Sequence, residues 1–373
     1  MNFHQLLEKM VDAGASDMFV TAKLAVSAKI NGELRPITEH ILSAKESLSL
    51  VYDAMNEKQI HQFDEEKECN FAISIEDIGR FRISAFWQRD MAGMVIRRIL
   101  TEIPNVDDLG LPSILKDVVM SKRGLLLFVG GTGTGKSTSM ASLIGYRNRN
   151  SRGHILTIED PVEFVHEHAK SMVTQREVGL DTESFDAALK SSLRQAPDVI
   201  LIGEIRSQET MEHALSFAET GHLCIATLHA NNANQAIDRI MHLVPADQHG
   251  KLLFDLALNL RGIIAQQLVP TSDGNGRVAA IEILLNSPYI AELIKKGEIG
   301  SIKEIMQKSK ELGMQTFDQA LFDLYQQSLI TYADAIHHAD SPNDLRLMIK
   351  LRGNDQSGVG GLTGVTIEGF EPK

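Results

Sequence analysis

Cysteine is nearly absent from this chain of 373 residues. Its two cysteines, Cys69 and Cys224, stand far apart, and neither has a second cysteine two to four residues away. This spacing excludes a disulfide framework and a four-cysteine zinc site. We therefore expect a protein of a reducing compartment that holds no zinc.

Long apolar runs and an excess of positive charge are also missing. No stretch approaches the roughly 20 apolar residues of a membrane-spanning helix. The first ten residues carry polar side chains where a signal peptide has an apolar segment, so we expect a cytoplasmic protein. Lys and Arg number 37 against 49 acidic residues, a formal charge of −12, and Trp87 is the single tryptophan. This composition disfavours broad attraction to nucleic acid and a base-stacking channel, so no nucleic-acid partner is expected.

The first 100 residues combine helical and alternating patterns. An amphipathic pattern over residues 6–11 ends at Gly14, a second helical pattern covers residues 43–55, and Asn31-Gly32 is typical of a hairpin turn. These patterns predict a small α+β domain over residues 1–100, followed by a Pro- and Gly-containing linker over 101–112. The alternating segments that predict strands are Met18–Thr21, Ser27–Ile30, Arg35–Ile37, Asn70–Ile75, Arg80–Gln88 and Met94–Ile99.

Beyond the linker the apolar residues form continuous runs, most of them separated by helical patterns. Such runs are typical of strands buried on both faces of a mainly parallel sheet, so residues 113–286 predict an α/β domain. Helical periodicity continues over 287–352, and the glycine-rich stretch 353–373 predicts a flexible tail. The continuous runs are Leu125–Val129, Ile155–Ile158, Val199–Ile202, Cys224–Leu228 and Ala279–Leu284.

A phosphate-binding loop follows the first of these runs. The segment matches G-x-x-x-x-G-K-[ST] and precedes a helical pattern over residues 136–146, the context that this motif requires. Its glycines let backbone N–H groups face the phosphates, Lys136 reaches the β and γ phosphates, and Ser137 ligates magnesium. The predicted nucleotide-binding residues are Gly130, Gly131, Thr132, Gly133, Thr134, Gly135, Lys136, Ser137 and Thr138.

Acidic side chains follow two more of the runs. Glu204 comes after the run Val199–Ile202, in the position that delivers a carboxylate to the magnesium side of a nucleotide site. Three carboxylates, Glu159, Asp160 and Glu163, lie within five residues after another run. One of these three is a candidate for polarising the attacking water, and the spacing alone does not say which.

Histidines and arginines give less specific signals. His222 and His229 bracket the run Cys224–Leu228 and so lie near opposite ends of a strand, where a structural role is more common than metal ligation. An arginine from the first domain can neutralise a γ-phosphate across a domain or subunit boundary, although a surface ion pair is the ordinary role. The arginines concerned are Arg80, Arg82, Arg89, Arg97 and Arg98.

Four motifs follow one another in a fixed order along the chain. With them the chain resembles the secretion-ATPase superfamily, and within it the PilT/PilU branch of type IV pilus retraction motors, over roughly residues 1–350. The motifs are the phosphate loop Gly130–Thr138, the acidic stretch Thr157–Phe164, the segment Asp198–Arg206, and the stretch from Gly221-His222 to Leu228-His229-Ala230.

This resemblance implies a fold, an activity and an assembly. The fold is a PAS-like N-terminal domain, a RecA-like ATPase domain and a helical C-terminal subdomain. The activity is hydrolysis of ATP with Mg²⁺ by a hexameric ring that powers pilus retraction and twitching motility. The ring would lie against the inner membrane through a pilus platform protein.

The resemblance also implies residue roles. By motif, Glu163 activates the water, Glu204 acts on magnesium and His229 senses the γ-phosphate. Arg82 and Arg97 match arginines of the family that reach the phosphates.

The departures from the family pattern point to the PilU side of the branch. Ser207 follows Arg206 where relatives often have Asp. Residues Ser301–Lys308 stand where PilT-type motors carry an Ala-Ile-Arg-Asn-Leu-Ile-Arg-Glu helix. Together with Ser341–Leu347, this segment is more similar to PilU, the accessory retraction ATPase, so a PilT-type motor is an expected partner.

Three other hypotheses share parts of this pattern. Pilus extension and type II secretion ATPases generally carry an extra N-terminal domain and a four-cysteine zinc insertion, whereas this chain has its phosphate loop at residue 130 and two cysteines. A nucleic-acid translocase with a RecA-like core is disfavoured by the acidic composition. A module that binds nucleotide without hydrolysis has no need of the carboxylates Glu163 and Glu204.

Overall fold

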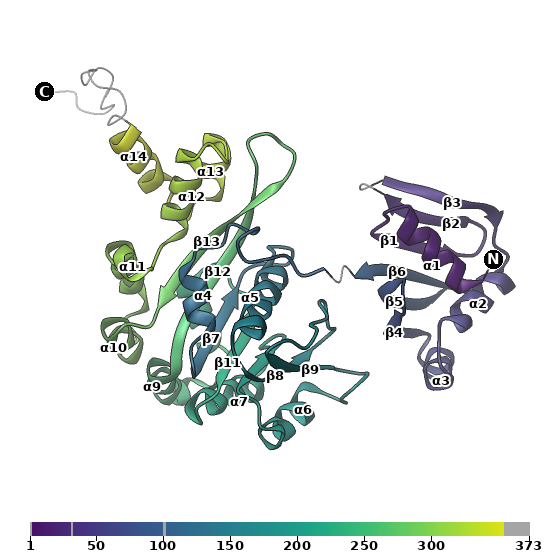
Figure 1. The fold of residues 1–373 in the computed structure, drawn as a ribbon, viewed down its shortest axis with the longest axis horizontal. Helices are drawn as coiled ribbons and strands as arrows, with labels where there is room; N and C mark the ends of the chain where they lie inside the picture. The colour runs from purple at the N-terminus through teal and green to yellow at the C-terminus, as the bar shows by residue number, and fades with distance from the viewer. Residues whose placement is uncertain (1, 31–32, 100–101, 354–373) are drawn as a thin grey trace, which may run out of the picture. The chain divides into compact units, whose positions relative to one another are not determined.

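The computed structural model describes residues 2–30, 33–99 and 102–353 (Figure 1). The predicted turn at Asn31-Gly32 and the predicted tail beyond residue 353 lie outside the described residues. The chain divides into two compact units, Met1–Pro104 with Ile144–Glu204, and Asn105–Leu143 with the chain from Ile205 onward. The boundaries predicted for the domains and the linker stay predictions.

The N-terminal residues form a six-stranded sheet with strand order β3-β2-β1-β6-β5-β4, in which every described pairing is antiparallel. Alternation explains these strands: in β5 the side chains of Phe81, Ile83 and Ala85 are buried and their neighbours are more exposed. This confirms the predicted α+β character. The elements are α1 (Phe3–Asp12), β1 (Asp17–Thr21), β2 (Ala25–Ile30), β3 (Glu33–Ile41), α2 (Ala44–Asp53), α3 (Glu57–Glu66), β4 (Glu68–Ile75), β5 (Gly79–Gln88) and β6 (Met91–Ile99).

The second sheet has seven strands in the order β13-β12-β7-β11-β10-β8-β9. The described pairs β7/β11, β7/β12, β8/β10 and β8/β9 are parallel, and only the edge pair β12/β13 is antiparallel among the described pairings. This confirms the predicted mainly parallel α/β sheet. Its strands are β7 (Gly124–Val129), β8 (Gly153–Glu159), β9 (Ser171–Glu177), β10 (Val199–Ile202), β11 (Leu223–Leu228), β12 (Leu260–Pro270) and β13 (Arg277–Leu285).

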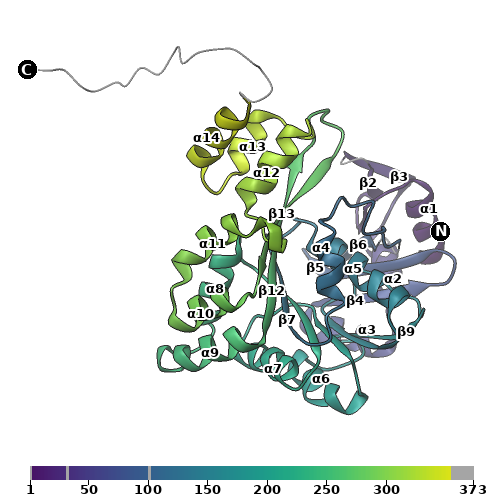
Figure 2. The same cartoon turned by 60° about the vertical axis from the view of Figure 1, so that its left-hand side comes forward.

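Helices flank this sheet and continue past its last strand. In the second unit α7 packs against β7 and β11, and α8, α10 and α11 gather on one side of β12 (Figure 2). Beyond β13 the named elements of the described residues are all helices, as the periodicity predicts, and Gln315 adds one isolated bridge to Ile283. The helices are α4 (Ile114–Val119), α5 (Lys136–Asn150), α6 (Phe185–Ser192), α7 (Gln208–Glu219), α8 (Ala233–Met241), α9 (His249–Asn259), α10 (Pro288–Lys296), α11 (Ile302–Lys308), α12 (Phe317–Gln326), α13 (Tyr332–His338) and α14 (Pro342–Gly353).

The helices are short relative to a membrane span. None of those in the described part of the chain combines the length and the apolar character that crossing a bilayer requires.

Candidate nucleotide-binding site

The phosphate loop lies between the fully buried strand β7 and the first turn of α5. Gly130, Gly133 and Gly135 have φ angles of 151°, 77° and 85°, a region that side chains disfavour. A Cβ on Gly130 would lie 2.5 Å from the backbone oxygen of Gln266, and one on Gly135 would lie 2.8 Å from the Gln266 side chain. The glycines are therefore required for the loop to curl, and the curled loop fits a bound phosphate.

The side chain of Lys136 folds back over this loop. Its Nζ donates hydrogen bonds to the carbonyl oxygens of Gly130 at 2.8 Å and Gly131 at 2.7 Å, and Lys136 is buried. The hydroxyl of Thr134 donates to the same Gly131 carbonyl at 2.9 Å. Ser137 follows at the start of α5, half-buried. The loop thus concentrates an ammonium group and helix N-terminal amides, which together suit a polyphosphate.

The acidic stretch after β8 separates its three carboxylates. Glu159 accepts hydrogen bonds from the Thr157 hydroxyl at 2.6 Å and from Gln175 at 3.2 Å. Burial raises the pKa of Glu159 and the nearby Glu163 charge adds to this rise, while the hydrogen bonds oppose it. Asp160 and Glu163 are exposed. Glu159 is therefore committed to internal hydrogen bonds, and the two exposed carboxylates remain the candidates for polarising water.

Glu204 follows β10 next to the end of β8. The strands run parallel with Ile202 opposite Ile158, and the amide of Gly203 donates to the Ile158 carbonyl at 2.8 Å. A Cβ on Gly203 would lie 3.1 Å from the Cα of Glu159, so glycine allows the two strand ends to approach closely. Glu204 and the acidic stretch thus leave the same edge of the sheet.

His229 and His222 lie at opposite ends of β11, as predicted. Strand β11 runs parallel to β7 with Leu228 opposite Val129, so His229 and Gly130 both follow this paired position. His222 at the other end shares its Nδ1 with the Thr220 hydroxyl at 3.1 Å and the Phe217 carbonyl at 3.2 Å. The structure therefore places His229, and not His222, at the edge that carries the phosphate loop.

Arg82 and Arg97 are opposite one another on β5 and β6 of the N-terminal sheet. Arg97 donates from Nε to Asp17 at 2.8 Å, and Arg82 is exposed. Burial raises the pKa of Asp17, but hydrogen bonds from Arg97 and Ser16, together with the charges of Arg97 and Lys29, outweigh it and hold that pKa below its usual value. Arg97 is thus engaged in an ion pair, whereas Arg82 presents its guanidinium to solvent.

The sequence analysis missed Gln266, which lies beneath the loop on β12. It follows Ala265, the partner of Val129 in the parallel pairing of β12 with β7. Gln266 is 3% exposed, and its Oε1 has no hydrogen-bond partner within the described residues. The sequence signal for Gln266 was the pair Gln266-Gln267 directly after the apolar run Ile263–Ala265, because a polar side chain buried in a strand normally needs a hydrogen-bond partner.

Ser207, which departs from the family pattern, is the N-cap of α7. Its hydroxyl accepts a hydrogen bond from the Thr210 amide, the capping role that Asp also performs.

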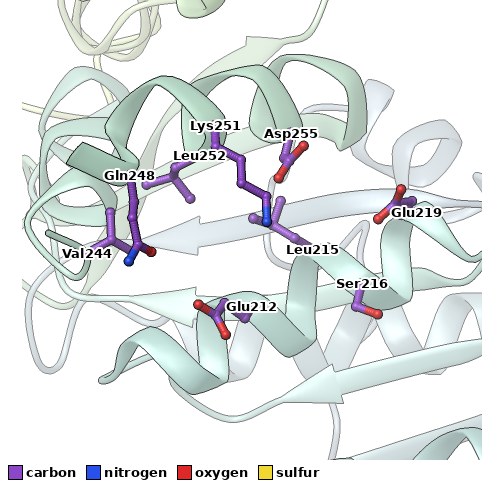
Figure 3. Close-up of a pocket in the computed structure, with 9 residues that line it drawn as sticks. All are labelled: Glu212, Leu215, Ser216, Glu219, Val244, Gln248, Lys251, Leu252 and Asp255. Atoms are coloured by element: carbon purple, nitrogen blue, oxygen red, sulfur yellow. The ribbon is translucent and has the colours of Figure 1, made fainter. Parts of the chain in front are cut away.

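A separate hollow between α7 and α9 contains none of the predicted site residues, and Figure 3 shows Lys251 extending across it. It is lined by Glu212, Leu215, Ser216, Glu219, Val244, Gln248, Lys251, Leu252 and Asp255.

Comparison with known proteins confirms the resemblance. The family model described as type II/IV secretion system protein matches residues 2–312. The chain is 62% identical over 351 residues to the type IV pilus ATPase PilU of Pseudomonas aeruginosa, covering 94% of this chain and 92% of PilU. It is 40% identical over 344 residues to the retraction ATPase PilT of that organism, covering 92% of this chain and 100% of PilT. A crystal structure of the pilus retraction motor PilT with bound ADP superposes with a TM-score of 0.88 at 38% identity, covering 93% of this chain and 100% of that one. The chain therefore belongs to the family of type II/IV secretion system proteins, in the branch that contains PilT and PilU.

Proposed function

We propose that this protein is an ATP-hydrolysing motor of type IV pilus retraction, of the PilU type. The observation that carries the proposal is the glycine loop closed by the buried Lys136, in a chain 62% identical to PilU over 94% of its length. Retraction is favoured over pilus extension because the chain lacks the cysteines of a zinc insertion.

The residues of the loop bind and orient the nucleotide. Lys136 and the first-turn amides of α5 neutralise phosphate charge, and the glycines let the backbone approach it. Ser137 and Glu204 would hold Mg²⁺, which neutralises the β and γ oxygens when it is bound. These hydroxyl and carboxylate oxygens suit a hard cation.

The remaining predicted residues act on the water and on the γ-phosphate. Glu163 is assigned to polarising the water, as the family motif implies; its carboxylate is exposed, like that of Asp160, while that of Glu159 is held by Thr157 and Gln175. His229 senses the γ-phosphate from the end of β11 beside the loop. Arg82 and Arg97 are assigned to neutralising the phosphates, with Arg82 the stronger candidate because Arg97 already pairs with Asp17.

The motor is proposed to work as a homohexameric ring at the cytoplasmic face of the inner membrane. Its proposed partners are a PilT-type motor and the pilus platform protein. ATP binding favours one conformation of each subunit, and hydrolysis releases the subunit from that conformation. This cycle of conformations moves the platform protein. The names of the relatives, the type IV pilus ATPase PilU and the retraction ATPase PilT, support the pilus part of this assignment.

A gene deletion in the source organism tests the function. Complementation with wild type should restore surface motility and normal piliation, and Lys136→Ala should leave excess pili without motility. Lys190→Ala is the matched control, because Lys190 is an exposed helix-surface lysine paired with Asp186. Bald cells after deletion would identify an assembly motor instead, and full rescue by Lys136→Ala would overturn the ATPase assignment.

A further inference from the structure

One buried carboxylate joins the first turns of two helices in the second unit. Glu282 on β13 is 2% exposed. Its Oε1 accepts the amide of Ala233 at 2.8 Å, and its Oε2 accepts the amide of Phe317 at 3.4 Å. Ala233 and Phe317 are the first residues of α8 and α12. Because one buried carboxyl group accepts hydrogen bonds from both first-turn amides, it fixes the two helix ends relative to each other.

The first of these helices starts just after the predicted phosphate sensor. Only residues 229–232 separate the end of β11 from the start of α8. Asn232 caps α8 and also donates from Nδ2 to Asp340 at 3.4 Å, and Asn234 donates to the carbonyl of Ile299, just before α11, at 3.1 Å. A shift of the His229 segment therefore moves the amide that Glu282 holds.

The start of α12 is connected to Lys303 on α11 through two carboxylates, Asp318 and Asp340. Asp318, the second residue of α12, is 1% exposed and accepts the amides of Asp340 at 2.9 Å and Ser341 at 3.2 Å. Lys303 Nζ lies 2.8 Å from Asp340 and 3.7 Å from Asp318. The ammonium thus ties α11 to the start of α12 and to the turn before α14, and Figure 2 shows α8 and α11 gathered on one side of β12.

The exposed ion pair on the same helix gives a contrast. Glu304 and Lys308 pair one turn apart on α11, with side chains 67% and 68% exposed, and in the described part of the chain they make no contact with these groups. Exposed pairs of this kind contribute little to stability. Of these two lysines of α11, Lys303 is therefore the one that connects the helix to α12 and to Asp340.

We propose that Glu282 is a positioning residue that couples the His229 segment to α11 through α8, α12 and Lys303. Occupancy of the phosphate loop then changes the position of the C-terminal helix that stands where PilT-type motors carry their distinctive motif. This coupling rests on the proposed nucleotide site. It is carried by a contiguous set of hydrogen bonds and not by distance alone.

Hydrogen exchange of the full-length protein, with and without a non-hydrolysable ATP analogue and Mg²⁺, tests the coupling. In the wild type we expect added protection in the phosphate loop, in residues 229–240 and in α11. In Glu282→Gln the side-chain NH₂ group cannot accept a hydrogen bond, so the first-turn amide of either α8 or α12 loses its hydrogen-bond acceptor. We expect the loop to respond as before and the α11 response to be lost. Glu304→Gln, on the exposed face of α11, should keep it.

A second pair of variants separates coupling from folding. Lys303→Met keeps the aliphatic stem and removes the charge, and Lys308→Met does the same at the exposed position. Loss of the α11 response in Lys303→Met alone supports the coupling, even where Glu282→Gln does not fold. An α11 response that equals wild type in Glu282→Gln or in Lys303→Met overturns it. A wild-type phosphate loop that does not respond overturns the nucleotide site itself, which is a distinct failure.

Discussion

At the scale of single residues, burial shifts the ionisation of Glu282. Burial raises the pKa of Glu282 to about 7, and the Asp340 charge adds to this, while the Ala233 amide, Lys303 and the Phe317 amide oppose it. In the unfolded chain the pKa is near 4.5. The native state therefore binds a proton more tightly than the unfolded state, and the resulting stability is present below pH 4.5 and lost as pH rises through 7.

This shift predicts a pH-dependent difference between wild type and Glu282→Gln. The free energy of unfolding of wild type minus that of the variant should fall by about 3 kcal/mol from below pH 4.5 to above pH 7, since each pKa unit is worth about 1.4 kcal/mol. Denaturant unfolding at both ends of this range measures it. A difference that stays constant with pH would contradict the assignment.

Substitutions of Glu159 and Glu163, the two glutamates of the acidic stretch, should affect ATP turnover differently. Glu163→Gln should lower ATP turnover by a factor of about 100 or more while nucleotide binding remains, because an amide cannot take a proton from water. Glu159→Gln keeps an acceptor for the hydrogen bonds from Thr157 and Gln175 and should reduce turnover much less. Steady-state turnover and nucleotide binding of both variants decide between them. The reverse order would assign the water to Glu159.

At the scale of elements, the glycine loop depends on two different requirements. Gly130 has φ 151° and would place a Cβ 2.5 Å from the Gln266 backbone oxygen, whereas Gly133 has φ 77° and open space within 4 Å. Gly130→Ala meets a backbone clash in addition to conformational strain, and Gly133→Ala meets the strain alone.

We therefore expect Gly130→Ala to lower the free energy of unfolding by about 3 kcal/mol or more, and Gly133→Ala by about 1 kcal/mol. Denaturant unfolding gives both values, and ATP binding should be lost in Gly130→Ala. Equal effects of the two substitutions would mean that Gln266 moves aside.

Helix α3 shows how an element escapes a pattern analysis. Phe63 is its single buried residue, so the apolar periodicity is weak. The ring of Phe63 stacks on Trp87 of β5 at 5.7 Å between centroids, a contact that the sequence does not reveal. The capping box of Asn56 with Gln59 was the local signal that marked the start of this helix.

At the scale of the whole molecule, variants of Arg82 and Arg97 test whether one subunit supplies an arginine to the nucleotide site of another. Arg82→Ala should leave the free energy of unfolding nearly unchanged, because its side chain is exposed, and should impair ATP turnover of the proposed ring. Arg97→Ala should also cost about 1 kcal/mol of stability, because it removes the ion pair with Asp17, which keeps its hydrogen bond from Ser16.

A mixing experiment decides whether Arg82 acts across a subunit boundary. We expect Arg82→Ala and Lys136→Ala each to inactivate the proposed ring on their own. In a mixed ring, an intact arginine of one subunit can serve an intact phosphate loop of another, so partial ATP turnover should return. Mixed rings that remain as inactive as the separate variants would place Arg82 on its own subunit's nucleotide or outside the site.

The sequence by itself determined the phosphate loop, the family and four of the parallel strands, β7, β8, β10 and β11, but not the parallel strands β9 and β12. These follow from local rules: the loop needs glycine at positive φ, and a doubly covered strand must be apolar throughout. Only the tertiary structure decided which carboxylate of the acidic stretch is held by hydrogen bonds, that Gln266 lies under the loop, and that Glu282 joins α8 to α12. Each of these depends on contacts between residues distant in sequence, which are fixed by sheet register and helix packing rather than by any local pattern.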